Sequence, residues 1–306
     1  MLFRSFNGSD NAENQISIIK KIDSFSKDYM TYQAMASLNF SRDIHSQKAK
    51  EEKEYYDSIS PELREVYDRF DKAIHESKFK EEIIREYGDT FTKQIEVSLK
   101  TFDPKIKEML REEIKLKNDY TTLTASAKIN FEGKDYNLAG LGPFHSDANR
   151  SVRKKSYEAR FEWFNENQDK LDDIYDKLVK LRHNIAVTLG YDNFIELGYH
   201  RMGRSDYGPS EVSTFREQII EHVVPVVNKL FEQKKSILGL DHLYFYDGIN
   251  FKDGDPKPKG TPEVLVKAAQ LMYHELSTET GKFFDIMVKI GRARLNSSHR
   301  CISYAV

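Results

Sequence analysis

The sequence contains almost no cysteine, little excess charge of either sign and no long apolar run. Cys301 is the only cysteine among 306 residues, which excludes an intramolecular disulfide framework and a cysteine-clustered zinc site. The 47 Lys and Arg nearly balance the 49 Asp and Glu, so we expect no nucleic-acid partner. Any metal ion would need His and carboxylate ligands.

No apolar segment approaches the ~20 residues that a membrane-spanning helix requires. The segment Met1–Gln15 also lacks the continuous apolar core of a signal peptide. We therefore expect a cytoplasmic protein with no membrane partner. The length allows two ordinary domains or one large helical domain.

Apolar residues recur at spacings of three and four, which is typical of amphipathic helices. The sequence therefore predicts a mainly α fold. The stripes expected to be buried are Ile18, Ile22, Phe25, Tyr29 and Tyr32; Leu63, Val66, Tyr67, Phe70 and Ile74; Ile106, Met109, Leu110 and Ile114; and Leu171, Ile174, Tyr175, Leu178, Leu181, Ile185 and Leu189.

Three dipeptides combine a side-chain acceptor with a proline, as helix starts often do: Ser60-Pro61, Asp103-Pro104 and Thr261-Pro262. Gly190 is well placed to end the helix that contains Leu181 in a left-handed conformation.

A further helical pattern runs from Ser210 to Leu238, with a stop at Gly239. Pro225 lies inside this pattern and lacks a backbone N–H, so we expect the helix to bend there.

One segment, about Ala125–Leu138, breaks the helical period. Ala127, Ile129 and Phe131 alternate with polar residues, and Glu132-Gly133 follows as a turn signal. We predict one small β-hairpin there. It either covers an edge of a helical core, as half-polar hairpins commonly do, or forms a wall of a cleft.

Four blocks occur in the order seen in one peptidase family. They are LTASAKINFEGKDYNLAGL (Leu123–Leu141), LVKLRHNIAVTLGYDNFIELGYHRMGRSDY (Leu178–Tyr207), FREQIIEHVVP (Phe215–Pro225) and LYFYDGINFKDGDPKPKG (Leu243–Gly260). From Ile16 to about Val288 the chain resembles the oligoendopeptidase F group of thimet-type zinc metallopeptidases. The resemblance implies a mostly helical fold with a deep channel between two lobes, cytosolic cleavage of internal bonds in oligopeptide substrates, and a zinc-binding His-Glu-x-x-His motif.

This chain contains only part of that motif, in His274-Glu275-Leu276-Ser277-Thr278. Thr278 occupies the position of the second imidazole, and a hydroxyl is a poor zinc ligand there. We therefore assign no catalytic residue and no metal ligand, and expect zinc in a complete family member but not bound by this chain. The remaining histidines lack paired ligand spacing: His45, His75, His145, His183, His200, His222 and His242.

We interpret the segment from Thr261 to Leu276 as a scaffold helix. The face that we expect to be buried contains Val264, Leu265, Ala268, Leu271, Met272 and Leu276.

The resemblance implies four regions. They are an N-terminal helical region (1–122), the hairpin with long helices (123–190), the start of a peptidase catalytic domain (191–290) and a tail (291–306). The tail contains RLNSSH (Arg294–His299), which resembles the peptide encoded by an in-frame sequencing adapter, so we expect Arg292–Val306 to be non-native. We expect the chain to be the front half of a longer enzyme, with its start also clipped.

A polar and aromatic cluster follows Gly190 and is a candidate for substrate binding. Its members are Tyr199, Arg201, Arg204 and Tyr207, with Asp206 between them in the sequence. An Arg can bind a peptide carboxylate through two hydrogen bonds. The alternative is an Arg-Asp pair that braces a loop between helices.

Three functional hypotheses remain. The leading one is the N-terminal fragment of a zinc oligopeptidase, inactive alone. The second is a non-catalytic helical peptide-binding module. The third is a protein-interaction module that binds through a surface near Phe283, Phe284 and Met287. Apolar surface exposed on such a fragment would also favour self-association.

Overall fold

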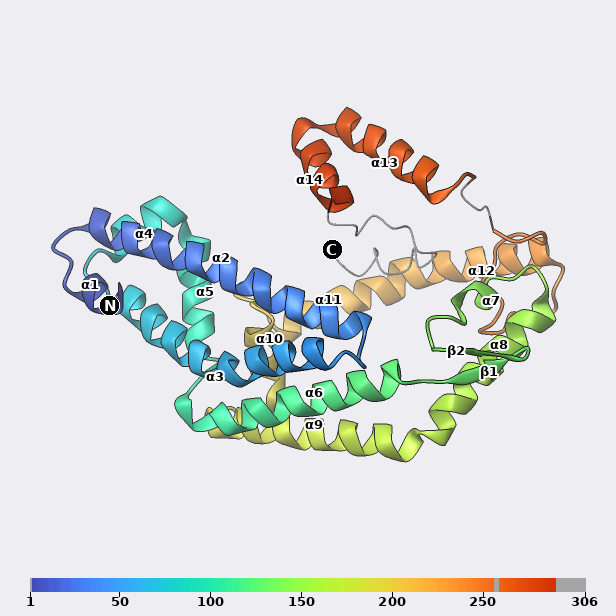
Figure 1. The fold of residues 1–306 in the computed structure, drawn as a ribbon, viewed down its shortest axis with the longest axis horizontal. Coiled ribbons are helices and arrows are strands. Elements are labelled where there is room, and N and C mark those ends of the chain that lie inside the picture. The colour runs from blue at the N-terminus through green and yellow to red at the C-terminus, as the bar shows by residue number, and fades with distance from the viewer. Residues whose placement is uncertain (1, 256–258, 290–306) are drawn as a thin grey trace. The chain divides into compact units, whose positions relative to one another are not determined.

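Helices form most of the structure (Figure 1). The computed structural model describes residues 2–255 and 259–289, so the predicted tail lies outside the described residues. The helices are α1 (Leu2–Asn7), α2 (Ala12–Arg42), α3 (Gln47–His75), α4 (Lys80–Tyr87), α5 (Asp89–Leu99), α6 (Lys107–Ala125), α7 (Gly142–His145), α8 (Arg150–Glu166), α9 (Gln168–Thr188), α10 (Phe194–Arg201), α11 (Pro209–Gln218), α12 (Val224–Leu238), α13 (Pro262–Leu276) and α14 (Thr278–Lys289). The predicted mainly α fold is confirmed. Within these residues no helix combines the length and apolarity needed to cross a bilayer.

The predicted hairpin is present. Strands β1 (Ile129–Phe131) and β2 (Lys134–Tyr136) pair antiparallel. Glu132 has φ 51° and Gly133 has φ 79°, as expected for the two central residues of a type I′ turn. The predicted start of the hairpin at Ala125 is wrong, because the Ser126 amide donates to the Thr122 carbonyl and α6 continues through Ala125.

Two predicted helix starts are confirmed. Asp103 accepts a hydrogen bond from the Lys105 amide (2.9 Å) and begins the 3₁₀ turn Pro104–Ile106, which leads into α6. Thr261 accepts one from the Val264 amide (3.5 Å) and begins α13. In both cases the proline occupies the first turn, where its missing N–H costs no helical hydrogen bond.

The helix start predicted at Ser60-Pro61 is wrong, because Pro61 lies inside α3. That helix begins directly after Ser46, whose hydroxyl accepts a hydrogen bond from the Ala49 amide (3.3 Å). Pro61 is among the most deeply buried side chains. Its packing offsets part of the cost of the backbone hydrogen bond that a proline cannot donate.

The perturbation expected at Pro225 is present, directly before that residue. A π-helical segment, Ile219–Val223, separates α11 from α12, and the Val224 amide donates to the Ile219 carbonyl. A π-helical turn is wider than an α-helical turn, and this one lies directly before Pro225, which cannot donate a backbone hydrogen bond. Gly190 (φ 91°) and Gly239 (φ 66°) follow α9 and α12 as predicted.

The chain divides into two compact units. Unit 1 comprises Met1–Ser126 and Glu166–Pro225, and unit 2 comprises Ala127–Asn165 and the chain from Val226 onward. The domain limits predicted from the sequence stay a prediction.

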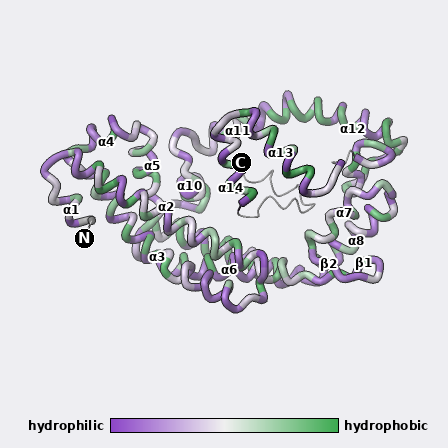
Figure 2. The backbone as a smooth tube through the Cα atoms, turned by 45° about the horizontal axis from the view of Figure 1, so that its top comes forward, coloured by the Kyte–Doolittle hydropathy of each residue, from purple (hydrophilic) through white to green (hydrophobic). Residues whose placement is uncertain are grey.

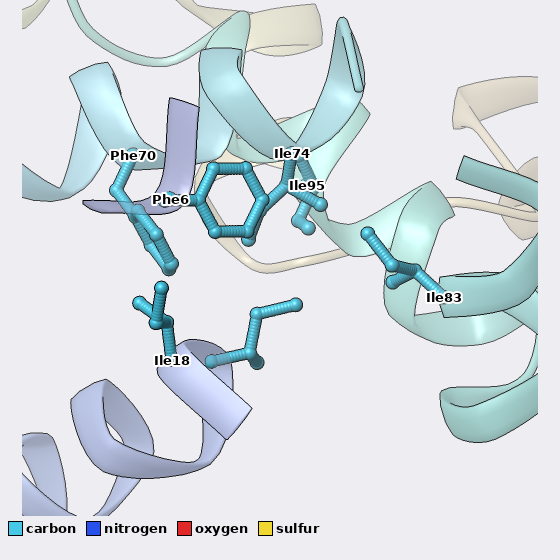
Figure 3. Close-up of a cluster of buried hydrophobic side chains, with 7 residues drawn as sticks. Phe6, Ile18, Phe70, Ile74, Ile83 and Ile95 are labelled. Atoms are coloured by element: carbon cyan, nitrogen blue, oxygen red, sulfur yellow. The ribbon is translucent and has the colours of Figure 1, made fainter. Parts of the chain in front are cut away.

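Unit 1 contains two hydrophobic cores. The first joins helices α1 to α5 and includes Phe6, Phe70 and Ile74, which Figure 3 shows pointing toward one another. The rings of Phe6 and Phe70 meet edge to face, with 5.1 Å between their centres. The second core contains Leu116, Ile185 and Leu197, so α6, α9 and α10 pack together.

Some residues of the predicted stripes are exposed. In α2, Phe25 and Tyr32 are 56% and 64% exposed, because this helix packs through Ile18 and Ile19 near its start and through Ala36 and Phe40 near its end. Val66 in α3 and Tyr175 in α9 are exposed as well. The burial predicted for these four positions is therefore wrong.

The face of α13 predicted to be buried is also exposed: Leu271 is 61% exposed and Leu276 is 74% exposed. Helix α13 packs against α14 through another side, where Tyr273 stacks on Phe284 with 4.6 Å between ring centres. Phe284 is therefore buried, which corrects its predicted place on an open surface.

Figure 2 shows hydrophobic residues along α12 and α13. We define the α13–α14 apolar face as the exposed residues Val264, Leu271, Met272, Leu276, Phe283 and Ile286.

Candidate functional site

The segment after Gly190 contains a short helix, α10. Asn193 accepts a hydrogen bond from the Ile195 amide (2.8 Å) and begins it, and fully buried Leu197 anchors it in the second core of unit 1. Gly203 has φ 68°, a left-handed conformation that reverses the chain after α10. The Arg204 amide then donates back to the Tyr199 carbonyl (3.2 Å).

This turn brings together three of the four predicted substrate-binding residues. The Arg204 guanidinium carbon lies 4.5 Å from the ring centre of Tyr199 and 5.5 Å from that of Tyr207. Both distances are typical of cation–π contacts. Among the described residues no carboxylate pairs with Arg204, so its N–H groups remain available to a ligand.

Arg201, the fourth predicted residue, is held elsewhere in unit 1. Its Nη2 donates to Oε2 of buried Glu113 (2.7 Å), and Nε of Arg182 donates to Oε1 (2.8 Å). Both guanidinium groups also lie over the Phe194 ring, at 5.7 and 5.8 Å. Burial acts to raise the pKa of Glu113, but the hydrogen bonds from the two arginines hold it below its ordinary value.

Sequence reasoning missed Glu113, although a signal was present. It follows Ile106 and Leu110 at the spacing of the buried stripe of α6, so a carboxylate occupies a position where an apolar residue is expected. A buried carboxylate requires a charged or hydrogen-bonding partner. Its two arginine partners come from α9 and α10, and sequence spacing does not identify them.

The predicted Arg-Asp brace is wrong. Asp206 instead pairs with Lys93 of α5, with 3.3 Å between the nitrogen and Oδ1. The neighbouring Gln94 donates from Nε2 to the Gly203 carbonyl (2.9 Å). Helix α5 therefore braces the loop after α10, while Arg204 stays with its two tyrosines.

The partial zinc motif divides between two helices. Helix α13 ends at Leu276, Ser277 is extended with φ −165°, and Thr278 begins α14. His274 and Thr278 therefore do not share a helical face. The His274 Nε2 lies 3.1 Å from each carboxylate oxygen of Asp285.

Zinc sites in proteins use three or four ligands from His, Cys and carboxylates. Within residues 2–255 and 259–289, no group of three or more such side chains is arranged to hold a metal ion. The described residues thus do not fit the zinc site that the family resemblance implies.

In unit 2, a buried carboxylate holds the segment after α12. Asp247 accepts hydrogen bonds from Arg150 Nε (2.9 Å), Arg153 Nη2 (3.2 Å) and the Tyr244 amide (2.9 Å). Burial acts to raise the pKa of Asp247, but these hydrogen bonds outweigh it and lower the pKa from 3.8 to about 2. Asp247 is therefore ionised and fixes this segment against α8.

Two family models match the chain. Residues 1–102 match the peptidase M3 N-terminal domain, and residues 144–267 match peptidase family M3. No curated protein sequence matches the chain.

Several solved structures are similar. A protein described as oligoendopeptidase F is 37% identical with a TM-score of 0.90, and the match covers 94% of this chain and 51% of that one. PZ peptidase A, solved with an inhibitor, is 38% identical with a TM-score of 0.90, covering 95% and 52%. An oligoendopeptidase F from Bacillus anthracis str. Ames is 36% identical with a TM-score of 0.88, covering 94% and 53%. The chain spans about half the length of these relatives. Its two ordered matches and these structural similarities place it in peptidase family M3.

Proposed function

We propose that the chain is the front, non-metal-binding part of a cytoplasmic zinc metallopeptidase that cleaves internal bonds of short peptides. The ordered family matches over residues 1–102 and 144–267 support this proposal, as do the oligoendopeptidase F structures of about twice the length. The sequence contains no His-Glu-x-x-His. The zinc ligands of the proposed enzyme therefore come from polypeptide that this sequence does not include.

One observation carries the expectation that the chain alone is inactive. Helix α13 ends at Leu276, between His274 and Thr278, and the His274 ring contacts Asp285. Two ligands four residues apart share a face only within one continuous helix, and the helix ends between these two residues.

Zinc content and peptidase activity test this proposal together. The purified chain is dialysed, its zinc is measured by mass spectrometry, and hydrolysis of an internally quenched oligopeptide is followed. We expect well under one zinc per chain and no turnover, whereas a full-length oligoendopeptidase F in parallel keeps its zinc and loses activity with chelator. Stoichiometric zinc in the chain with chelator-sensitive turnover would contradict the proposal.

A second candidate function is peptide binding without hydrolysis. Arg204 supports it, because this guanidinium is stacked on Tyr199 and Tyr207 and has no carboxylate partner among the described residues. We retain these three side chains as proposed peptide contacts. Arg201 is a weaker candidate, because Glu113 already occupies one of its donors.

Fluorescence polarisation of a labelled oligopeptide tests the second candidate. Replacing Arg204 with Ala should weaken binding about tenfold, the usual effect of losing a hydrogen bond to a charged group. The Lys93→Ala variant is the control, because it removes the loop brace and leaves Arg204 and both tyrosines. An isotherm unchanged by Arg204→Ala would remove Arg204 from the proposed site.

A further inference from the structure

A pocket of about 330 Å³ opens in unit 1 where α3, α5 and α10 meet. Its basic lining residues are Arg64, His200 and Arg201, and its apolar wall includes Phe102 and Leu110. None of the described residues that line it is Asp or Glu. A pocket with a basic rim and an apolar wall favours an anionic organic ligand.

Arg64 is fixed in orientation at this pocket. Its Nη2 donates to the Ser98 carbonyl (2.8 Å), to Ser98 Oγ (2.9 Å) and to Thr101 Oγ1 (3.2 Å). Its guanidinium carbon lies 5.6 Å from the ring centre of Phe102. The other guanidinium nitrogens donate to no described partner, so their N–H groups remain available to a ligand.

Arg201 supplies the second guanidinium. Only its Nη2 is engaged, by Glu113 Oε2 at 2.7 Å. Because Glu113 is shared with Arg182, one carboxylate faces two guanidinium groups and a net positive charge remains. Arg182 does not line the pocket, which makes it a matched control for Arg201.

One further carboxylate lies near Arg64. Asp71 accepts a hydrogen bond from Ser98 Oγ (2.7 Å) and interacts electrostatically with Arg64. Burial raises the pKa of Asp71, so the environment disfavours its negative charge. Arg64, Arg182 and Arg201 together outnumber the two carboxylates Asp71 and Glu113, so a net positive charge remains.

His200 adds a group that can gain a proton. Tyr191 donates its hydroxyl hydrogen to the Lys100 carbonyl oxygen (2.9 Å). His200 Nδ1 lies 2.8 Å from the Tyr191 hydroxyl oxygen, so Nδ1 is the donor in this second hydrogen bond. The Nε2 of the neutral ring is therefore an acceptor, and protonation converts it into a donor. Burial and the charge of Lys100 lower the pKa of His200, and Glu196 acts in the opposite direction.

We propose that this pocket binds a small organic carboxylate, with the carboxylate against Arg64 and Arg201 and the apolar part against Phe102 and Leu110. Arginine matches a carboxylate through parallel N–H donors. The volume is at the small end of ligand pockets, which corresponds to a ligand of amino-acid size. This proposal does not depend on peptide hydrolysis, so its test is a binding measurement on the chain itself.

Isothermal titration calorimetry with N-acetyl-L-leucine tests the ligand class. The neutral control, N-acetyl-L-leucinamide, has the same apolar part and should bind about tenfold more weakly or worse. A tripeptide with a free carboxyl end distinguishes a peptide terminus from a free small acid, and either source supports the proposal. Equal affinity for acid and amide, no binding of the acid, or binding of inorganic phosphate alone would overturn it.

Two matched variants test the assigned residues. Arg201→Gln and Arg182→Gln each remove one of the two arginines that hold Glu113, so their structural costs should be similar. Arg201→Gln should weaken N-acetyl-L-leucine about tenfold, and Arg182→Gln should leave affinity within about twofold. Equal effects of the two variants, with matching circular dichroism melting curves, would contradict the assignment.

The pH dependence of affinity tests the site without Arg201→Gln, so it can still be measured if that variant does not fold. Protonation of His200 adds a positive charge among Arg64, Arg201, Lys100 and Glu196, so affinity for the acid should rise as the pH falls from 8 to about 5.5. In His200→Gln the affinity at pH 8 should persist and this rise should disappear. An unchanged rise in the variant would remove His200 from the site.

Discussion

Asp247 and Glu113 are two buried carboxylates, and each accepts hydrogen bonds from two arginines. Both have lowered pKa values despite burial, because the charged hydrogen bonds outweigh the loss of hydration. The two sites differ in their surroundings. Arg153 beside Asp247 is only 2% exposed, whereas the two arginines of Glu113 are more accessible.

Removing the charge of Asp247 should destabilise unit 2. In Asp247→Asn the buried Arg153 keeps its charge without a counterion, and losing one partner of a buried pair typically costs about 3 to 5 kcal/mol. The only tryptophan, Trp163, lies in α8 of the same unit and is buried, so urea denaturation followed by its fluorescence reports the change. Asp206→Asn, at an exposed ion pair, should change the curve little. Matching curves for both variants would contradict the prediction.

The same carboxylate predicts a difference with pH. A group with a lowered pKa stabilises the fold above its unfolded value near 4, and this contribution is lost as the pH falls through the folded value of about 2. The gap in urea midpoint between the native chain and Asp247→Asn should therefore be constant from pH 7 to 5 and shrink between pH 4 and 2. A gap independent of pH would show that ionisation of Asp247 is not its source.

At the residue scale, sequence spacing located part of the candidate site. Tyr199, Arg204 and Tyr207 were expected near one another, and the left-handed turn at Gly203 brings them together. Arg201 was placed in the same cluster, yet its partner is Glu113, 88 residues away in the sequence. Contacts over such separations depend on how helices pack, and a single sequence does not specify that.

At the element scale, several helix limits follow from local chemistry. Capping at Asp103 and Thr261 and the glycine after α9 were predicted because they depend on neighbouring residues alone. Pro61 was misassigned because the cost of a proline inside a helix was offset by burial, which is a tertiary effect. Exposed residues such as Phe25 show the same limit, since periodicity identifies a stripe but not whether another helix covers it.

The α13–α14 pair should depend on the absence of a side chain at Gly281. A Cβ there would lie 2.7 Å from the His274 Cγ, too close without a shift of the ring or the helix. Gly281→Ala should therefore destabilise the pair by about 1 kcal/mol or more and accelerate amide hydrogen exchange in both helices. Mass spectrometry of exchanged peptides measures this.

The control for Gly281→Ala is Gly248→Ala, because an added Cβ there meets nothing within 4 Å. The double variant His274→Ala with Gly281→Ala removes the obstructing ring and should exchange like His274→Ala alone. If Gly281→Ala exchanges like the native chain, the close approach of the two helices does not limit their packing.

At the scale of the whole molecule, unit 2 exposes several large apolar side chains on one helix pair, α13 and α14. The α13–α14 apolar face contains Leu276 at 74% exposure and Phe283 at 60%. The solved relatives are about twice as long as this chain, so they contain polypeptide that has no counterpart here. We expect this face to bind a second copy of the chain, because association would remove these apolar side chains from water.

Self-association through this face is the last prediction. In analytical ultracentrifugation the native chain should sediment faster as its concentration rises, because copies bury apolar side chains against one another. The variant Leu271→Glu, Leu276→Lys and Phe283→Lys should remain a monomer, with its circular dichroism melting curve confirming that it folds. Tyr175→Lys, which removes an exposed aromatic ring from unit 1, is the control and should associate like the native chain. A native chain that stays monomeric at every concentration would exclude a second copy as the occupant, since the variant would then have nothing to disrupt.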